Sequence, residues 1–389
     1  MRTWFFTETA WPYLPDEYDS IRVTLPNRHY EPHIGAELYH RYLDEWLHAE
    51  QLGLDLMLNE HHQTATCLDP AAPIMLGVLA RQTSRARLLL LGNPIANRRQ
   101  PVRVAEEMAM VDNLARGRIE VGFVRGVPYE ISAANASPLR MSERFWEAHD
   151  LILKAWTTHD GPFSWEGRFF HHRQVNIWPR PYQQPHPPVW ITALSTASVP
   201  AVAEKGYVVA TFLTGFDIAK RIFDSYREAA ARLGRETPLD RLAYAALVYT
   251  GDTDEVGQAG ARKLMWYMHA NKVPPQFVMP PGYVPVEAEA QAIRKGSVYD
   301  FSRLTLEQAM SQGIVFAGNP DSVFKQIKAH YEHVGGYGHL LLMGQAGFLD
   351  HRETVVGIDR FARDVYPRLR QLAGDSDVAR ISSESDTLT

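Results

Sequence analysis

The chain has one cysteine, little net charge for its size and no long apolar run. Among its 389 residues only Cys67 carries a thiol, so an internal disulfide is impossible, and we predict a reducing, cytoplasmic environment. A formal net charge of -5 gives no electrostatic reason to expect nucleic acid or an anionic membrane as a partner. Apolar runs such as the one from Leu88 to Leu91 are far shorter than the ~20 residues that cross a bilayer.

Eight short aliphatic or β-branched runs alternate with amphipathic helical stretches, a pattern typical of parallel α/β architecture. Eight such units predict a (β/α)8 barrel, or TIM barrel, rather than an open doubly wound sheet. The predicted strands are Thr3–Thr7, Asp55–Asn59, Ala86–Asn93, Arg118–Val124, Pro188–Ala193, Tyr207–Leu213, Ala243–Tyr249 and His339–Met343. The predicted helices include one that contains Leu38 to Leu47 and ends at Gly53, and others over Pro101–Leu114, Ser142–Trp156, Ala197–Lys205 and Pro320–Val334.

Three segments interrupt this alternation. Residues 11–34, rich in Pro, Tyr and Arg, are interpreted either as a loop over the barrel mouth or as an excursion that packs on the barrel wall. Residues 271–311, with two Pro-Pro pairs, form an insertion between the seventh and eighth strands. Residues 374–389 have few large apolar side chains and are predicted to be a disordered tail after a barrel of residues 1–373.

Residues just past the carboxyl ends of barrel strands converge on the active site of such a fold. The most unusual of these groups is Glu60-His61-His62, because three polar side chains in a row cannot all be buried without partners. Two structural histidines bonded to loop carbonyls are the alternative. Cys67 is interpreted either as a thiol nucleophile near these histidines or as a small residue in a loop. The other residues at predicted strand ends are Glu8, Asn93, Arg125, Leu194, Ser195, Gly344 and Gln345.

Metal binding is not expected at these histidines. Adjacent side chains, here and at His171-His172, diverge and do not easily ligate one ion. No His-x-Glu, HExxH or CxxC spacing accompanies them, so we predict that the site holds no metal.

Hydroxyl groups and an arginine predict a site for a phosphorylated ligand. Ser195 and Ser198 open the helix after the fifth strand, where free backbone N–H groups and the positive helix end favour an anion. An ordinary serine N-cap is the alternative. Arg125, followed by Gly126 after the fourth strand, supplies a cation beside the same position.

Several blocks of the sequence, in order, resemble the bacterial-luciferase-like flavin-dependent monooxygenases. Together they extend from Arg2 to Leu372. They are Leu52-Gly53-Leu54-Asp55 with Asn59-Glu60-His61-His62, Pro101–Glu107 with Asp112, Gly117-Arg118 and Gly122–Gly126, Pro187–Trp190 with Ala193, Ser195 and Ala203–Gly206, and finally Gly318–Asp321 and Val365–Pro367.

The resemblance implies a reduced FMN cofactor and O2 as co-substrate, which form a C4a-peroxyflavin that oxygenates an organic substrate. The aromatic side chains of residues 11–34 predict that this substrate is small and largely apolar or planar. It implies a catalytic His61 that assists proton transfer, with Glu60 and His62 in support. It also implies that Arg125, Ser195 and Ser198 bind the cofactor phosphate. It further implies that Asn93 lies at the flavin ring, because the Gly92-Asn93 bond falls where the family can carry a non-proline cis peptide.

Two alternatives to this function remain open. One is hydride transfer with the deazaflavin F420, although such relatives tend to carry an Asp-His pair where this chain has Glu60-His61-His62. The other is a flavin-binding accessory subunit without catalysis, against which His61 argues. Since no GxGxxG fingerprint for a nicotinamide cofactor is present, we expect a separate flavin reductase as partner. We also expect a homodimer.

Overall fold

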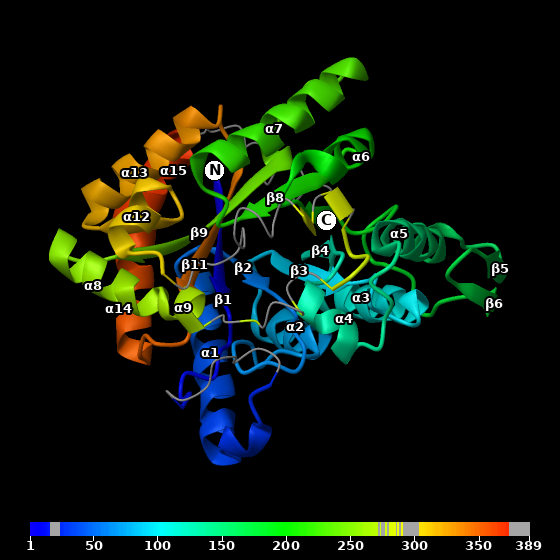
Figure 1. The fold of residues 1–389 in the computed structure, drawn as a ribbon, viewed down its shortest axis with the longest axis horizontal. Helices are drawn as coiled ribbons and strands as arrows, with labels where there is room; N and C mark the ends of the chain where they lie inside the picture. The colour runs from blue at the N-terminus through cyan, green and yellow to red at the C-terminus, as the bar shows by residue number, and fades with distance from the viewer. Residues whose placement is uncertain are drawn as a thin grey trace, which may run out of the picture.

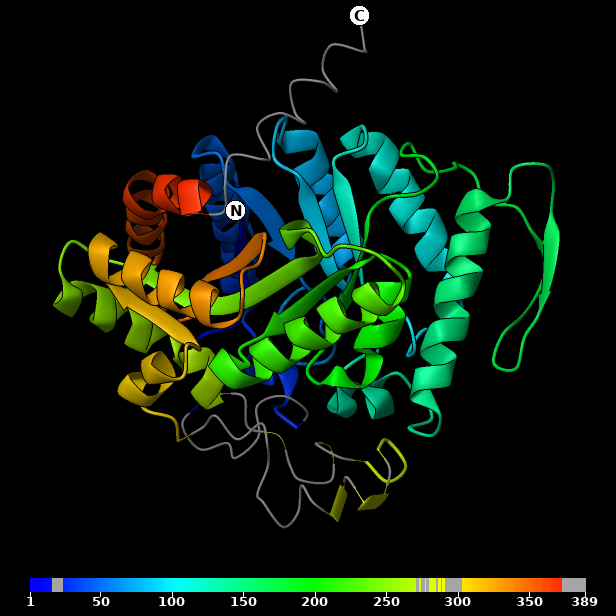
Figure 2. The ribbon, with the colours of Figure 1, turned by 90° about the horizontal axis from the view of Figure 1, so that it is seen from above.

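The structure is a computed structural model that describes residues 1–15, 24–270, 273, 277, 280–284, 286–287, 289–290 and 303–372. Eight parallel strands close into a barrel, and the strand that follows the others in sequence pairs back with the first (Figures 1 and 2). The predicted (β/α)8 fold is therefore confirmed. In spatial order the barrel strands are β1 (Arg2–Thr7), β2 (Asp55–Leu58), β3 (Leu88–Pro94), β4 (Ile119–Val124), β7 (Val189–Thr192), β8 (Val208–Phe212), β9 (Leu242–Thr250) and β11 (His339–Gln345).

Helices follow the strands and surround the barrel (Figure 2). The five predicted helices are all present. Among the described residues the α-helices are α1 (Pro32–Gln51), α2 (Ala72–Gln82), α3 (Pro101–Ala115), α4 (Pro128–Ala133), α5 (Met141–Thr157), α6 (Val199–Glu204), α7 (Gly215–Arg232), α8 (Asp254–Leu264), α9 (Trp266–Ala270), α12 (Leu306–Ser311), α13 (Pro320–His333), α14 (His351–Arg360) and α15 (Tyr366–Leu372). Short 3-10 helices lie at η1 (Asn27–His29), η2 (Thr196–Ser198) and η3 (Leu239–Arg241), and the π-helical turn η4 (Phe361–Val365) joins α14 to α15. None of the helices in the described ranges is long and apolar enough to cross a membrane.

Three strands lie outside the barrel and were not predicted. β10 (Val315–Gly318) pairs with the second half of β9, beyond the residues of β9 that pair with β8. β5 (Phe163–Glu166) and β6 (His171–Val175) form an antiparallel hairpin that projects past α5, away from the barrel (Figure 1). The hairpin is short and mostly exposed, so it lacks the buried aliphatic run on which the strand predictions depended.

The amino-terminal half of the barrel interior is filled by aromatic rings and a buried charge cluster. Trp4 and Trp190 meet edge to face with ring centroids 5.5 Å apart, and Trp4 Nε1 donates to His339 Nδ1 at 3.1 Å. Glu120 accepts from Trp190 Nε1 and pairs with Arg87. Because each of these buried polar groups has a partner, the cluster fixes the strand register rather than destabilising the core.

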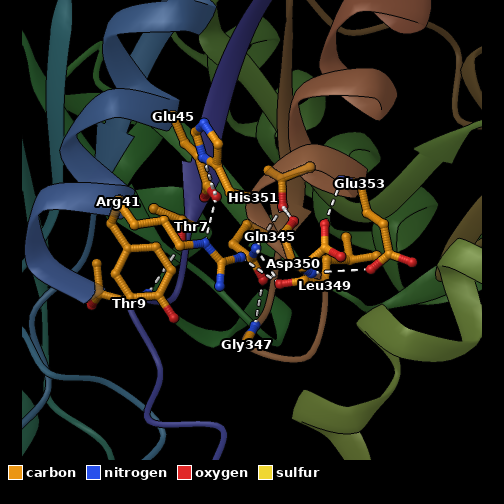
Figure 3. A network of polar contacts seen from close by, with 12 residues as sticks. Thr7, Thr9, Arg41, Glu45, Gln345, Gly347, Leu349, Asp350, His351 and Glu353 are labelled. Carbon is orange, nitrogen blue, oxygen red and sulfur yellow. Dashed lines mark hydrogen bonds and ion pairs between the residues drawn. The ribbon is translucent and has the colours of Figure 1, made fainter. Parts of the chain in front are cut away.

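The last β/α unit is tied to the first helix by a polar network, shown in Figure 3. Arg41 on α1 donates to the Leu349 carbonyl and, at 2.8 Å, to Glu45, while His351 Nδ1 lies 3.3 Å from the same Glu45 oxygen. Gln345, at the end of β11, accepts from Gly347 N at 2.7 Å and donates to Thr354 at 2.6 Å. The side-chain amide of Gln345 thus holds this turn with both its oxygen and its nitrogen.

The described part of residues 11–34 packs on the barrel wall. Trp11 is buried in the core between strands and helices, its backbone N–H donates to Ala65 O at 2.8 Å, and its ring lies 4.8 Å from that of Tyr30. The packing alternative therefore fits Trp11 and Tyr30, whereas residues 16–23 lie outside the described residues. Residues 271–311 lie between β9 and β11 as expected, but most of them, and residues 373–389, also lie outside the described residues.

A buried histidine predicts acid sensitivity of the fold. His330 on α13 stacks on Tyr244 with centroids 3.9 Å apart, and neither of its ring nitrogens makes a hydrogen bond of good geometry within the described residues. Burial lowers its pKa to about 4, against a smaller opposing effect of the Gly215 backbone. Between pH 6.5 and 4 the unfolded chain therefore binds a proton that the native state does not, so the free energy of unfolding falls as the pH falls. His330→Phe removes this proton uptake, so its free energy of unfolding should fall less steeply with pH, by about 1.4 kcal/mol per pH unit. Urea titrations at pH 7, 5.5 and 4.5 measure the difference. The exposed control His159→Phe should retain the wild-type slope, and equal slopes for both variants would refute the assignment.

Candidate active site

His61 is held at the barrel mouth by a carboxylate that sequence reasoning missed. His61 follows β2, and its Nδ1 lies 2.8 Å from Oε1 of Glu130, on the short helix α4 that follows β4. The same Glu130 oxygen accepts the backbone N–H of His62 at 3.0 Å, and Tyr129 Oη lies 3.2 Å from His61 Nδ1. Glu130 is almost completely buried, so its two partners are needed to satisfy its charge.

This geometry selects one tautomer of His61. A carboxylate can only accept a hydrogen bond, so the His61 proton lies on Nδ1 and Nε2 keeps its lone pair in the neutral ring. Although burial alone would raise the pKa of Glu130, the attraction and hydrogen bond of His61 hold it below its usual value. Glu130 therefore stays ionised and stabilises the imidazolium form when Nε2 gains a proton. Within the described residues Nε2 of His61 has no hydrogen-bond partner.

Glu60 and His62 form a second, separate pair. Oε1 of the buried Glu60 lies 2.9 Å from His62 Nε2 and also accepts a hydrogen bond from Arg98, in the loop after β3. The two adjacent histidines thus bind different carboxylates, His61 to Glu130 and His62 to Glu60. The alternative in which both histidines bond loop carbonyls does not describe this arrangement.

Cys67 has the environment of a small buried residue. Its Sγ lies 3.6 Å from Thr9 Oγ1 and 3.7 Å from Asn59 Oδ1. Burial and the nearby carboxylates of Glu8 and Asp69 raise the pKa of the Cys67 thiol well above its ordinary value. A thiol that stays protonated is a poor nucleophile, so the structure favours the loop-residue interpretation.

Two buried amides lie at the end of β3 and in the loop after it. Asn93 is fully buried, its Nδ2 donates to Gly122 O at 3.2 Å and contacts Met108 on α3, and its Oδ1 has no partner among the described residues. Asn97 is also buried, neither its Oδ1 nor its Nδ2 has a partner among those residues, and a methyl group added to Gly126 would lie 2.5 Å from Nδ2. The role of Asn93 at the flavin ring stays a prediction. The non-proline cis peptide is Leu91–Gly92, one bond earlier than the predicted Gly92–Asn93.

Arg125 is a cation without a carboxylate partner in the described residues. It follows β4 directly, and its Nε donates to Tyr283 Oη at 3.0 Å, while its guanidinium lies 4.2 Å from the centre of the Tyr283 ring. A half-buried guanidinium beside a neutral phenol keeps its whole charge, which is the electrostatic condition for binding an anion.

Ser195 and Ser198 lie at the neighbouring strand end. β4 and β7 pair in parallel, with Phe123 opposite Ile191, so Arg125 and Ser195 leave the barrel side by side. Neither serine caps the helical turn that it precedes, because no side-chain cap bond is present at η2 or α6. The N-cap alternative is therefore not realised, and both hydroxyls remain available to a ligand. Within the described residues, no group of three or more His, Cys, Asp or Glu side chains is arranged to hold a metal ion.

The fold and site define a (β/α)8-barrel enzyme with a histidine-carboxylate pair and a free cationic arm at its mouth. The model of the luciferase-like monooxygenase family matches residues 21–338, and the chain belongs to this family. The resemblance found in the sequence blocks is thereby confirmed, and with it an oxidoreductase.

Curated relatives match at low identity or over part of the chain. The oxygenase component of the flavin-dependent trigonelline monooxygenase of Acinetobacter baylyi is 22% identical over 89% of this chain and 94% of its own length. The FMNH2-dependent dimethylsulfone monooxygenase of Pseudomonas putida is 26% identical over 70% of this chain and 71% of its own length. An uncharacterised protein of Sinorhizobium fredii, y4wF, is 32% identical, but over only 44% of this chain and 49% of its own length.

Solved structures share the fold. Monooxygenase RslO1 from Streptomyces bottropensis superposes with a TM-score of 0.73 at 21% identity, covering 95% of this chain and 100% of that one. The oxygenating constituent of 3,6-diketocamphane monooxygenase from Pseudomonas putida, in complex with FMN, has a TM-score of 0.69 at 19% identity, covering 94% and 98%. An F420-dependent secondary alcohol dehydrogenase has a TM-score of 0.66 at 16% identity, with the same coverage. Fold likeness alone does not separate the FMN and F420 enzymes.

The Glu130 contact predicts the protonation of His61. In the wild type, 15N NMR of neutral His61 should show the proton almost entirely on Nδ1. Glu130→Gln removes the charge, so the Nε2–H tautomer should rise to a comparable population, and the free energy of unfolding should fall by about 1–3 kcal/mol as the buried bonds weaken. Glu166→Gln, at the exposed partner of His171, is the matched control. An unchanged His61 tautomer in Glu130→Gln would contradict the assignment.

Proposed function

We propose that this protein is the oxygenase component of a two-component flavin monooxygenase. It takes reduced FMN from a separate reductase, uses O2 and transfers one oxygen atom to a small, apolar organic substrate. Relatives described as an oxygenase component and as FMNH2-dependent support this choice of cofactor and partner. The homodimer and the cytoplasmic location remain predictions.

The observation that carries the proposal is the fixed pair of His61 and Glu130. With Nδ1–H directed to Glu130, His61 can accept a proton only at Nε2, and the Glu130 charge stabilises the cation that results. His61 can then return that proton from the same atom. Reduced FMN bound at the mouth would supply the electrons that activate O2, and His61 would hold and deliver the proton that this chemistry exchanges.

The residues around Arg125 fit the phosphate of FMN. The guanidinium lacks a counter-charge among the described residues, and the unbonded hydroxyls of Ser195 and Ser198 flank the next strand end. Asn97 adds a buried amide with no partner behind Gly126. A bound phosphorylated ligand would satisfy these groups, because unpaired buried polar atoms are costly and an arginine fork matches phosphate geometry.

Two other functions compete with this proposal. F420 also carries phosphate, so the same anion site would suit an F420-dependent hydride transfer, and one structural neighbour is such an enzyme. The Glu60-His61-His62 sequence and the relatives whose names specify a flavin favour FMN. A non-catalytic accessory subunit is disfavoured by His61 itself, because its Nε2 has no partner among the described residues whereas the ring of His62 is bound to Glu60.

Cofactor and oxygen dependence separate the first two functions. The protein should bind reduced FMN, and on mixing with O2 in a stopped-flow spectrometer the flavin should reoxidise through a transient, oxygen-dependent spectrum. Candidate substrates should be screened for those that accelerate its decay and appear as oxygenated products. Substrate turnover with reduced F420 under anaerobic conditions, without any reaction of reduced FMN, would overturn the proposal.

Replacing His61 tests its chemical role. His61→Asn should lower the rate of substrate oxygenation by about 10²–10⁴-fold, which is the usual contribution of a positioned acid or base, and should change the affinity for FMN only slightly. The exposed His159→Asn is the control and should keep the wild-type rate. An undiminished rate in His61→Asn would refute the assignment of His61 as the acid-base group.

A further inference from the structure

Tyr283 reaches the arginine of the anion site from a distant part of the chain. Residues 280–284 lie between β9 and β11, yet Tyr283 contacts Arg125 at the end of β4. A methyl group added to the neighbouring Gly282 would lie 2.3 Å from Leu139, in the segment between α4 and α5. The short segment around Tyr283 is therefore packed closely against the connections that follow β4.

Tyr283 holds the Arg125 guanidinium in two ways. Its ring covers one face, with the guanidinium carbon 4.2 Å from the ring centroid, and its hydroxyl accepts the Nε–H at 3.0 Å. The hydroxyl in turn donates toward Gly126 O at 3.4 Å. The ring, the hydroxyl and the Gly126 carbonyl thus fix both the plane and the rotation of the guanidinium.

Tyr283 leaves the terminal N–H donors of Arg125 free to bind a ligand. Arginine carries five N–H donors, and Tyr283 occupies only the one on Nε. The two terminal amino groups have no carboxylate or hydrogen-bond partner in the described residues. Burial raises the pKa of the Tyr283 hydroxyl and Arg125 only partly opposes this, so the phenol stays neutral and does not cancel the arginine charge.

We propose that Tyr283 is a positioning residue for the cofactor phosphate, which orients Arg125 so that its two terminal amino groups face the anion. This rests on the proposed function, because it assigns the anion to the phosphorylated cofactor. It makes Tyr283 part of the cofactor site, and it gives this residue a role in selecting phosphorylated over unphosphorylated flavin.

The test compares FMN with riboflavin, which has the same ring but no phosphate. Dissociation constants of both are measured by fluorescence titration for the wild type, Tyr283→Phe, Tyr283→Leu and Arg125→Ala. Tyr283→Phe keeps the ring and loses the hydroxyl, so the preference for FMN should fall about three- to tenfold while riboflavin binding is unchanged. Tyr283→Leu should reduce the preference further, and Arg125→Ala should abolish it.

A double variant shows whether Tyr283 acts through Arg125. In the Arg125→Ala background, Tyr283→Phe should have no additional effect on FMN binding, because the group that it orients is absent. Tyr182→Phe, at an exposed tyrosine, is the matched control and should bind both flavins like the wild type. Urea titrations of all variants confirm that they are folded.

The outcomes are distinct. An unchanged FMN preference in Tyr283→Phe and Tyr283→Leu would overturn the inference, and so would tighter FMN binding, since Tyr283 would then compete with the phosphate. If the wild type bound neither flavin, the proposed function would fail, and calorimetry with inorganic phosphate would replace the titration. Weaker phosphate binding in Tyr283→Phe than in the wild type would then support the positioning role, and equal binding would refute it.

Discussion

The hydrogen bonding of β9 to β8 on one side and to β11 on the other converts a nine-stranded parallel sheet into a closed barrel. Once the sheet is closed, the carboxyl ends of eight strands meet at one rim, and the connections that follow them meet as well. His61 after β2 and Glu130 after β4 can touch because only β3 separates these two strands in the sheet. The same strand pairs with β10 beyond β8, so β9 also sets where the chain between β9 and β11 returns to the barrel.

Two buried carboxylates, Glu60 and Glu130, bind different groups at the barrel mouth. Glu60 accepts from His62 and Arg98 and so fixes the loops after β2 and β3. Glu130 accepts from the His61 ring and from the His62 backbone, which orients the one imidazole whose second nitrogen is left free. The rings of the two neighbouring histidines are therefore bound to different carboxylates. Glu60 and His62 thus hold neighbouring loops together, and the catalytic role of His61 with Glu60 and His62 in support stays a prediction.

The charge distribution differs between the two sides of the barrel mouth. Near β2, Glu60 and Glu130 each have a basic partner. After β4, Arg125 bonds the neutral phenol of Tyr283 and has no carboxylate partner in the described residues. The field of this side would therefore attract an anionic ligand more than that of the other side.

The sequence by itself determined the eight barrel strands, five of the helices and the residues at the strand ends, because buried aliphatic runs and strand-end positions are local properties of the chain. It also identified His61, Arg125, Ser195 and Ser198 as candidates. It missed β10 and the β5–β6 hairpin, which are short. Only the tertiary structure decided which groups are partners. Glu130 lies 69 residues from His61, and Tyr283 lies 158 residues from Arg125. Only the tertiary structure also shows that the Asn93 Nδ2 donates to Gly122 on the neighbouring strand, while the Asn97 amide has no partner among the described residues.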